Sequence, residues 1–174
     1  MLSVLVCTYN QERYIAQAID SVLMQKCDEA FEILVGDDCS TDNTRTIVDD
    51  YQKQYPEVIR VIRPEKNGGA SLNMIRLIEN AKGEYLSICD GDDYWCNKDR
   101  LTEQVALMEQ NPNIGLCYTL AERREGEGRF VGRFPIGEGH TSLDTMLHDW
   151  CVENCTTLAS RESVLDYYAT EKPE

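Results

Sequence analysis

Three aspartates crowd the stretch Asp90-Gly91-Asp92-Asp93, which closely follows the apolar run from Tyr85 to Ile88. Two carboxylates about 4 Å apart repel by roughly 4 kcal/mol at the effective dielectric of a partly buried site. An exposed turn could disperse that charge into water, whereas a strand end inside a cleft needs a cation. Carboxylate oxygens are hard ligands, and no His or Cys accompanies them in a ligand-like pattern. The stretch therefore favours Mn²⁺ or Mg²⁺ over a solvated turn.

Polar residues also follow three other apolar runs. Thr8-Tyr9-Asn10 follows the first run, Asp37-Asp38 the second and Asn67-Gly68-Gly69 the third. Taken alone, each of these stretches is explained at least as well by a helix cap or a turn. In open α/β sheets, however, ligands bind outside the carboxyl ends of the strands. Four polar stretches at those ends therefore predict one shared site.

The charge balance restricts the ligand. Lys and Arg number 17 against 31 Asp and Glu, and the resulting net charge of −14 disfavours nucleic acid or an anionic membrane surface as a partner. A diphosphate could still enter a carboxylate-lined site if a divalent ion neutralised it, and the same ion would stabilise a diphosphate leaving group. The residues alone thus favour group transfer from a nucleoside diphosphate.

The eight cysteines bear on the compartment, because they include no C-x-x-C pair and lie mostly in apolar runs. Such thiols are typical of buried, reduced cysteines. His148, Cys151 and Cys155 lack the second ligand pair of a structural zinc site. No secretory signal pattern and no apolar stretch of membrane-spanning length is present, so we expect a soluble, cytoplasmic domain. Peripheral association with a membrane is not readable from these residues.

An α/β sheet is expected to position the polar stretches, because short apolar runs alternate with helical patterns. The runs predict strands at Val4–Cys7, Phe31–Val35, Val58–Ile62, Tyr85–Cys89 and Ile114–Tyr118. The spacing between them predicts four helices: one capped by Asn10, one opened by Thr41 or Asp42, one bearing Leu72, Ile75 and Ile78, and one bearing Leu101, Val105 and Met108.

Beyond Tyr118 the pattern is weaker. Residues 121–139 are rich in Gly, Glu and Arg, and predict a surface excursion or lid with a short strand at Arg129–Val131. A helix at Ser142–Trp150, a strand at Cys155–Ala159 and a helix at Arg161–Tyr168 are expected to follow. Continuous apolar strands alternating with helices predict a Rossmann-like, mostly parallel sheet with helices on both faces.

The ordered set of motifs resembles family 2 glycosyltransferases, which have the GT-A fold. The matching pieces are Ser3–Asn10, Tyr14-Ile15, Ser21–Gln25, Phe31–Asp42, Asn67–Gly69, and Gly83–Tyr85 leading into Asp90–Asp93. One piece alone would carry little weight, whereas the order and spacing of all of them are specific. The resemblance covers residues 2–118 strongly and the remainder loosely.

The resemblance implies a nucleotide-sugar site, with UDP as the nucleotide and Asp92 of an Asp-x-Asp motif as the metal ligand. It implies that Asp37 accepts a hydrogen bond from a uracil ring nitrogen, that Asp38 supports its loop, and that Asp93 assists the metal or orders the loop. The nucleotide-binding residues that it implies are Thr8, Tyr9, Glu12, Asp37, Asn67, Gly68 and Asp90.

The resemblance also implies transfer with inversion to an acceptor hydroxyl, in polysaccharide or surface-glycan synthesis. Inversion needs a base at that hydroxyl, and the family supplies it from an acidic motif that we expect beyond Glu174. We therefore expect one GT-A domain over residues 1–174, truncated at its C-terminus, with a nucleotide-binding part at 1–118 and a partial acceptor-side part at 119–174. Solvated helix faces explain Asp149, Glu153 and Asp166 as well as a catalytic role does.

Two alternatives stay open beside this function. The chain could bind a donor without turnover if the catalytic base is missing. It could also be a sugar nucleotidyltransferase, but that activity needs a Gly-rich, Arg- or Lys-bearing phosphate loop after the first strand, and Thr8–Glu12 offers none. In the leading interpretation the partners are a nucleotide-sugar donor and a glycan or lipid-linked acceptor, the cofactor is Mn²⁺ or Mg²⁺, and no nucleic acid is bound.

Overall fold

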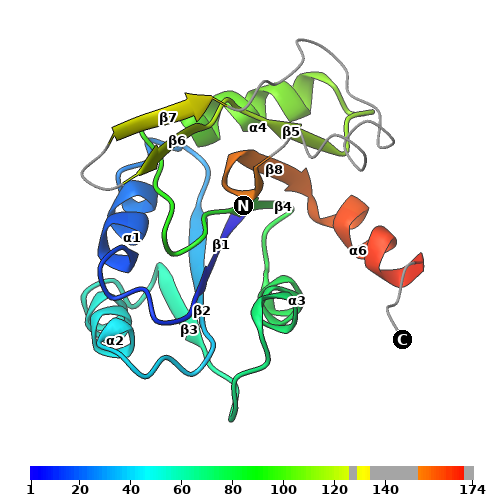
Figure 1. Cartoon of the computed structure of the whole chain (residues 1–174). Coiled ribbons are helices and arrows are strands. Elements are labelled where there is room, and N and C mark those ends of the chain that lie inside the picture. Colours follow the sequence, from blue (N-terminus) through cyan, green and yellow to red (C-terminus); the bar gives the residue numbers. More distant parts are fainter. Residues whose placement is uncertain (126–128, 134–152, 171–174) are drawn as a thin grey trace.

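A six-stranded sheet forms the centre of the computed structural model, which describes residues 1–125, 129–133 and 153–170 (Figure 1). The strand order is β3-β2-β1-β4-β8-β5. The first four strands in this order run parallel, and β8 lies antiparallel between β4 and β5. The predicted mostly parallel α/β sheet is therefore confirmed. The strands are β1 Leu2–Thr8, β2 Phe31–Asp37, β3 Ile59–Ile62, β4 Tyr85–Ile88, β5 Leu116–Tyr118 and β8 Thr157–Ser160.

Helices cover both faces of this sheet, with α1 and α2 on one side and α3 and α6 on the other in Figure 1. The described helices are α1 Ile15–Leu23, α2 Thr44–Gln54, α3 Ala70–Asn80, α4 Arg100–Gln110 and α6 Arg161–Thr170. Side chains alternate along a strand, so β1 contributes to two separate cores. Val4 and Val6 pack with Ile15 of α1 and Leu101 of α4, whereas Leu5 packs with Leu77 of α3.

The strand register brings the predicted site residues to one edge. Thr8 pairs with Asp37 at the carboxyl ends of β1 and β2. Leu5 of β1 pairs with Ile88, the last residue of β4, so the chain after β4 continues beside the end of β1. Because all three strands are parallel, the polar stretches that follow them meet at this edge.

Three of the predicted helix details are wrong. The first helix begins at Ile15, and Asn10 takes a left-handed conformation with φ 54° in which its side chain accepts a hydrogen bond from the Thr41 amide. The second helix begins at Thr44, and Asp42 caps the turn before it by accepting the Thr44 amide. Leu72, one of the apolar residues from which α3 was predicted, is 53% exposed and so does not lie on the buried face of that helix.

The later elements are partly described. The predicted short strand is confirmed as β7 (Arg129–Arg133), which pairs with β6 (Glu122–Glu125) in an antiparallel hairpin. The predicted strand at Cys155–Ala159 begins later, at Thr157, because residues Asn154–Thr156 form the 3-10 turn η1. The helix predicted at Ser142–Trp150 lies outside the described residues. Across the part of the chain that is described, no helix combines the length and apolar character needed to cross a membrane.

Candidate functional site

A cavity of about 890 Å³ opens at the carboxyl edge of the sheet. Small-ligand pockets commonly measure roughly 300–1,000 Å³. Its lining residues are Cys7, Thr8, Tyr9, Gln11, Asp38, Asn67, Gly69, Ala70, Ser71, Asn73, Met74, Ile75, Asp90, Asp92, Asn154 and Tyr167. The structure therefore brings five of the predicted site residues together in one cavity: Thr8, Tyr9, Asn67, Asp90 and Asp92.

The aspartate loop is fixed to the end of β1 by its backbone. The Gly91 amide donates to the Cys7 carbonyl at 2.8 Å, and the Asp93 amide donates to the Asp90 carbonyl at 2.9 Å. A Cβ at position 91 would overlap the Gln11 side chain and come within 2.9 Å of the Thr8 hydroxyl oxygen. Glycine is thus required at the centre of the Asp-x-Asp stretch, because only glycine lets the loop approach β1 so closely.

The charges of this loop are crowded and lack a basic partner. Burial, followed by the nearby carboxylates of Asp93, Asp92 and Glu153, raises the pKa of Asp90 to about 6. Burial likewise raises the pKa of Asp93, although a hydrogen bond with Cys155 opposes the shift. Within the described ranges, no Lys or Arg forms an ion pair with these aspartates. The loop therefore has a negative charge that a cation would neutralise.

The residues present fit a divalent cation that binds together with a phosphate ligand. Among residues 1–125, 129–133 and 153–170, no group of three or more His, Cys, Asp or Glu side chains is arranged to hold a metal by itself. Mg²⁺ sites, however, commonly use one or two carboxylates and complete the shell with waters and substrate phosphates. Asp90 and Asp92 both line the cavity. Nearby, the Thr8 hydroxyl and the side-chain oxygen Oε1 of Gln11 are buried without a hydrogen-bond partner in the described chain.

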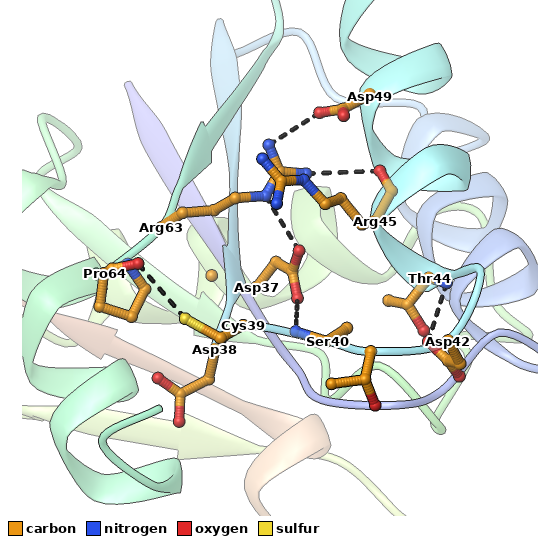
Figure 2. A network of polar contacts seen from close by, with 12 residues as sticks. Asp37, Asp38, Cys39, Ser40, Asp42, Thr44, Arg45, Asp49, Arg63 and Pro64 are labelled. Carbon is orange, nitrogen blue, oxygen red and sulfur yellow. Dashed lines mark hydrogen bonds and ion pairs between the residues drawn. The ribbon is translucent and has the colours of Figure 1, made fainter. Parts of the chain in front are cut away.

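Asp37 is buried, is not among the residues that line the cavity, and has both carboxylate oxygens engaged by the protein (Figure 2). One carboxylate oxygen accepts the Ser40 amide at 3.0 Å, and the other accepts the Arg63 guanidinium at 2.9 Å. Arg63 is also paired with Asp49 at 2.7 Å. Burial alone would raise the pKa of Asp37, but the hydrogen bonds from Ser40 and the pairing with Arg63 outweigh it, so the pKa lies below its ordinary value.

Asp38 is the member of this pair that lines the cavity. Its carboxylate accepts the amides of Gly68 at 3.0 Å and Gly69 at 2.7 Å, and Arg76 lies 3.5 Å away. The Asn67 side chain donates to the Asp38 carbonyl, so the Asn67–Gly69 turn closes around this residue. Adjacent residues at a strand end point to opposite sides, which places Asp37 against α2 and Asp38 at the cavity. Gly68 therefore acts on the site through Asp38.

The Glycosyl transferase family 2 model matches residues 3–167, which is nearly the whole chain. The chain belongs to glycosyl transferase family 2. The carboxyl-edge cavity of this family 2 chain is thus the expected position for a ligand on an open α/β sheet.

Three related proteins illustrate this membership. The putative teichuronic acid biosynthesis glycosyltransferase TuaG of Bacillus subtilis is 33% identical over 93% of this chain and 63% of its own length. Crystal structures of Staphylococcus aureus TarS with UDP share 27% identity at a TM-score of 0.72, covering 95% of this chain and 48% of that one. The mannosyltransferase PcManGT of Pyrobaculum calidifontis, in complex with GDP-Man and Mn²⁺, shares 25% identity at a TM-score of 0.63, over 70% and 35%. The chain thus spans between about a third and two thirds of the lengths of these relatives.

Glu12, another predicted nucleotide-binding residue, lies away from the cavity wall of this family 2 chain. Its carboxylate accepts the Asn43 amide at 2.9 Å, and its own amide donates to Asp42 at 3.1 Å. The Gln11 amide donates to the Thr44 hydroxyl at 2.8 Å in the same region. These bonds fasten the loop after β1 to the start of α2, so Glu12 holds Tyr9 and Gln11 in place.

Several cavity residues escaped the sequence analysis. Asn73 is 1% exposed, donates its side-chain amide to the Gly36 carbonyl at 2.7 Å, and keeps a buried carbonyl oxygen without a partner in the described chain. A polar residue in the apolar stripe of a helix is the signal that could have revealed it. Asn154 and Tyr167 also line the cavity. Their signal is absent from local sequence, because the antiparallel insertion of β8 beside β4 brings them there.

Proposed function

We propose that this family 2 chain binds a UDP-linked sugar in the carboxyl-edge cavity and transfers the sugar, with inversion, to a hydroxyl of a glycan or lipid-linked acceptor. The observation that carries the proposal is the pair Asp90 and Asp92, which line a cavity of suitable volume and have no basic partner in the described part of the chain. TarS structures containing UDP and UDP-GlcNAc support the nucleotide class, since this chain aligns with them over 95% of its length.

Asp92 would hold Mn²⁺ or Mg²⁺ against the donor diphosphate, and Asp90 would lie on the ribose side. A divalent cation there supplies positive charge to a diphosphate leaving group as negative charge develops on it. The structure of PcManGT in complex with GDP-Man and Mn²⁺, which resembles this chain, supports a divalent metal at this site. The protein contributes a rigid loop, because the backbone of Gly91 is bonded to the end of β1.

The nucleoside would lie across the ends of β1 and β2. Tyr9 lines the cavity and is 47% exposed, so its ring is available to stack on a base. The predicted contact between Asp37 and the uracil ring is better assigned to Asp38, because Asp38 lines the cavity while Asp37 is occupied by Ser40 and Arg63. In this assignment Asp37 orders the loop, and Asn67 borders the base.

The test is UDP binding measured by isothermal titration calorimetry with Mn²⁺, with Mg²⁺ and with EDTA. We expect binding to require the metal, and we expect Asp92→Asn to weaken it by at least about tenfold, the lower range for disturbing a metal site. Asp50→Asn is the matched control, because Asp50 is an exposed carboxylate of α2 whose ion-pair partner in the described part of the chain is Lys53. Equal binding in EDTA, or an unaffected Asp92→Asn variant, would remove the metal assignment.

Catalysis is tested separately by release of free UDP from UDP-sugars in the presence of candidate glycan acceptors. Transfer that depends on Asp92 supports the enzyme. Metal-dependent binding without any transfer, across acceptors that include anionic cell-wall polymers, would instead favour a donor-binding protein without turnover.

A further inference from the structure

Asn154 occupies a distinctive position at the cavity. It lies in the 3-10 turn η1, is exposed, and lines the cavity together with Asp90 and Asp92. In the described residues, no group hydrogen-bonds its side-chain amide. An exposed amide at the wall of a cavity carries both donors and an acceptor that are free to bind a ligand.

The backbone around Asn154 is held firmly. The Glu153 carbonyl accepts both the amide of Thr156 at 2.9 Å and its hydroxyl at 2.6 Å. The Thr157 hydroxyl donates to the Asn154 carbonyl at 2.8 Å. The turn therefore presents Asn154 in one orientation of its backbone.

Three buried side chains fix this turn to the rest of the fold, and we call them the bracket: Trp95, Arg100 and Gln104. They donate to three consecutive carbonyls, those of Cys155 at 2.9 Å, Thr157 at 3.2 Å and Thr156 at 3.0 Å, respectively. The Arg100 guanidinium also lies 3.9 Å from the centre of the Trp95 ring.

The bracket connects the η1 turn to the aspartate loop, Asp90–Asp93. Trp95 lies three positions after Asp92, and it donates to the carbonyl of Cys155, the residue that follows Asn154. Burying an arginine whose Nε and Nη1 have no hydrogen-bond partner in the described chain is unfavourable. The fold accepts this unfavourable burial at Arg100, which is consistent with a need to hold the η1 turn in a fixed position.

The sheet order shows which part of a donor would reach Asn154. Along the carboxyl edge, Asp38 follows β2, Thr8 ends β1, Asp90 and Asp92 follow β4, and Asn154 precedes β8. A nucleoside at β2 and β1, with its diphosphate at β4, directs the group on the second phosphate toward β8. That group is the sugar.

We propose that Asn154 binds hydroxyl or acetamido groups of the transferred sugar. In this proposal the bracket positions Asn154 by setting its distance from the aspartate loop. The proposal rests on the proposed function, because it requires a nucleotide sugar in the cavity. It goes further by naming a residue that contacts the sugar rather than the nucleotide.

The first experiment compares a nucleotide sugar with its free nucleoside diphosphate, both with Mn²⁺, by calorimetry. The probes are UDP-GlcNAc, UDP-glucose and GDP-mannose, with UDP and GDP as references. For the nucleotide sugar that the wild type binds most tightly, we expect Asn154→Ala to weaken binding by about three- to tenfold, the value of one neutral hydrogen bond. Binding of the free diphosphate should stay within about twofold of wild type.

The outcomes separate the two proposals. If Asn154→Ala weakens both ligands equally, or neither, the role in sugar binding is overturned while the proposed function stands. If the wild type binds none of the probes with Mn²⁺, the proposed function fails, and this inference fails with it.

The bracket is tested with Trp95→Phe, which keeps a ring beneath Arg100 but loses the hydrogen bond to Cys155. Tyr51→Phe is the matched control, because it removes a hydroxyl that donates to Asp20 of α1 at 2.7 Å and lies far in sequence from the bracket. We expect Trp95→Phe to reduce the sugar-dependent part of the affinity and Tyr51→Phe to leave it unchanged at a similar melting temperature. If both variants retain the sugar-dependent part of the affinity, the bracket has a purely structural role.

Discussion

Asp37 and Asp38 each lie against an arginine, whereas Asp90 and Asp92 have no basic partner among the described residues. The two acidic stretches lie at the same sheet edge, after β2 and after β4, which flank β1. Arg63 and Arg76 neutralise the first stretch within the fold. The second remains negative, and the pKa of Asp90 rises to about 6 through burial and its neighbouring carboxylates.

This difference separates scaffold from ligand site. Carboxylates that are satisfied by protein donors order a loop and need nothing more. Carboxylates that are left close together without a cation lower stability unless something binds there. Two aspartate-rich stretches therefore have opposite consequences, and the positions of the arginines decide which consequence applies.

Removing the arginine that pairs with Asp37 should change the stability of the fold more than any other substitution considered. Arg63→Ala leaves the fully buried Asp37 carboxylate without its ion-pair partner, which should lower the free energy of unfolding by about 3–5 kcal/mol. Urea denaturation at pH 7 measures the change. The exposed Arg45→Ala is the control and should alter stability by no more than about 0.5 kcal/mol. A loss no larger than that of the control would show that Asp37 does not depend on Arg63.

Removing a charge from the second stretch should act in the opposite direction. In EDTA, Asp90→Asn should raise the free energy of unfolding by about 1–2 kcal/mol, because it relieves repulsion in the aspartate loop. Urea denaturation again gives the value, with Asp50→Asn as the control at an exposed carboxylate. A less stable Asp90→Asn variant would contradict the view that this loop lacks a cation.

The two stretches should also respond oppositely to pH in EDTA. The folded-state pKa of Asp90 is raised from 3.8 to about 6, so its ionisation costs stability as pH rises through about 6. The pKa of Asp37 is lowered, so its contribution is present above the unfolded value of 3.8 and is lost as pH falls below it.

Stability in EDTA should therefore increase by about 1 kcal/mol as pH falls from about 7.5 to 5, and decrease at lower pH. Thermal melts across this range test the prediction, and Asp90→Asn should remove the increase. If the stability of the wild type instead decreased steadily as the pH was lowered from 7.5, the charges of the aspartate loop would already be compensated.

The smallest effect concerns the backbone beside the first stretch. Cys39 takes a left-handed conformation with φ 64°, which glycine adopts more easily than other residues. We expect Cys39→Gly to be more stable than Cys39→Ala by about 1 kcal/mol, because both lose the thiol and only alanine keeps the strain. Equal melting temperatures for the two variants would show that the loop relaxes around position 39.

Much of the fold could be predicted from the apolar runs. The parallel strands follow from continuous apolar residues, and the convergence of Thr8, Asp90 and Asp92 follows from parallel strand direction. The role of Asn10, the start of the second helix and the exposure of Leu72 were predicted wrongly because side-chain contacts decide them. Leu72 is exposed since Asn73 must turn inward to bond Gly36, and Asn10 bonds Thr41 instead of capping the first helix.

The candidate site was harder to predict where partners are distant in sequence. Asp37 and Asp38 are neighbours of the same type, and only Arg63, Arg76 and the Gly68 amide show which of them lies at the cavity. Asn154 reaches the site because β8 inserts antiparallel beside β4. No local pattern indicates a crossing of that kind.

The central claim is that Asp92 holds the divalent cation that binds the donor diphosphate. The most direct measurement is the anomalous diffraction signal of Mn²⁺ in crystals of the protein grown with UDP. The account predicts one manganese peak within bonding distance of the Asp92 carboxylate and of diphosphate oxygens. A UDP molecule bound in the cavity without manganese at Asp92, or with manganese elsewhere, would contradict it.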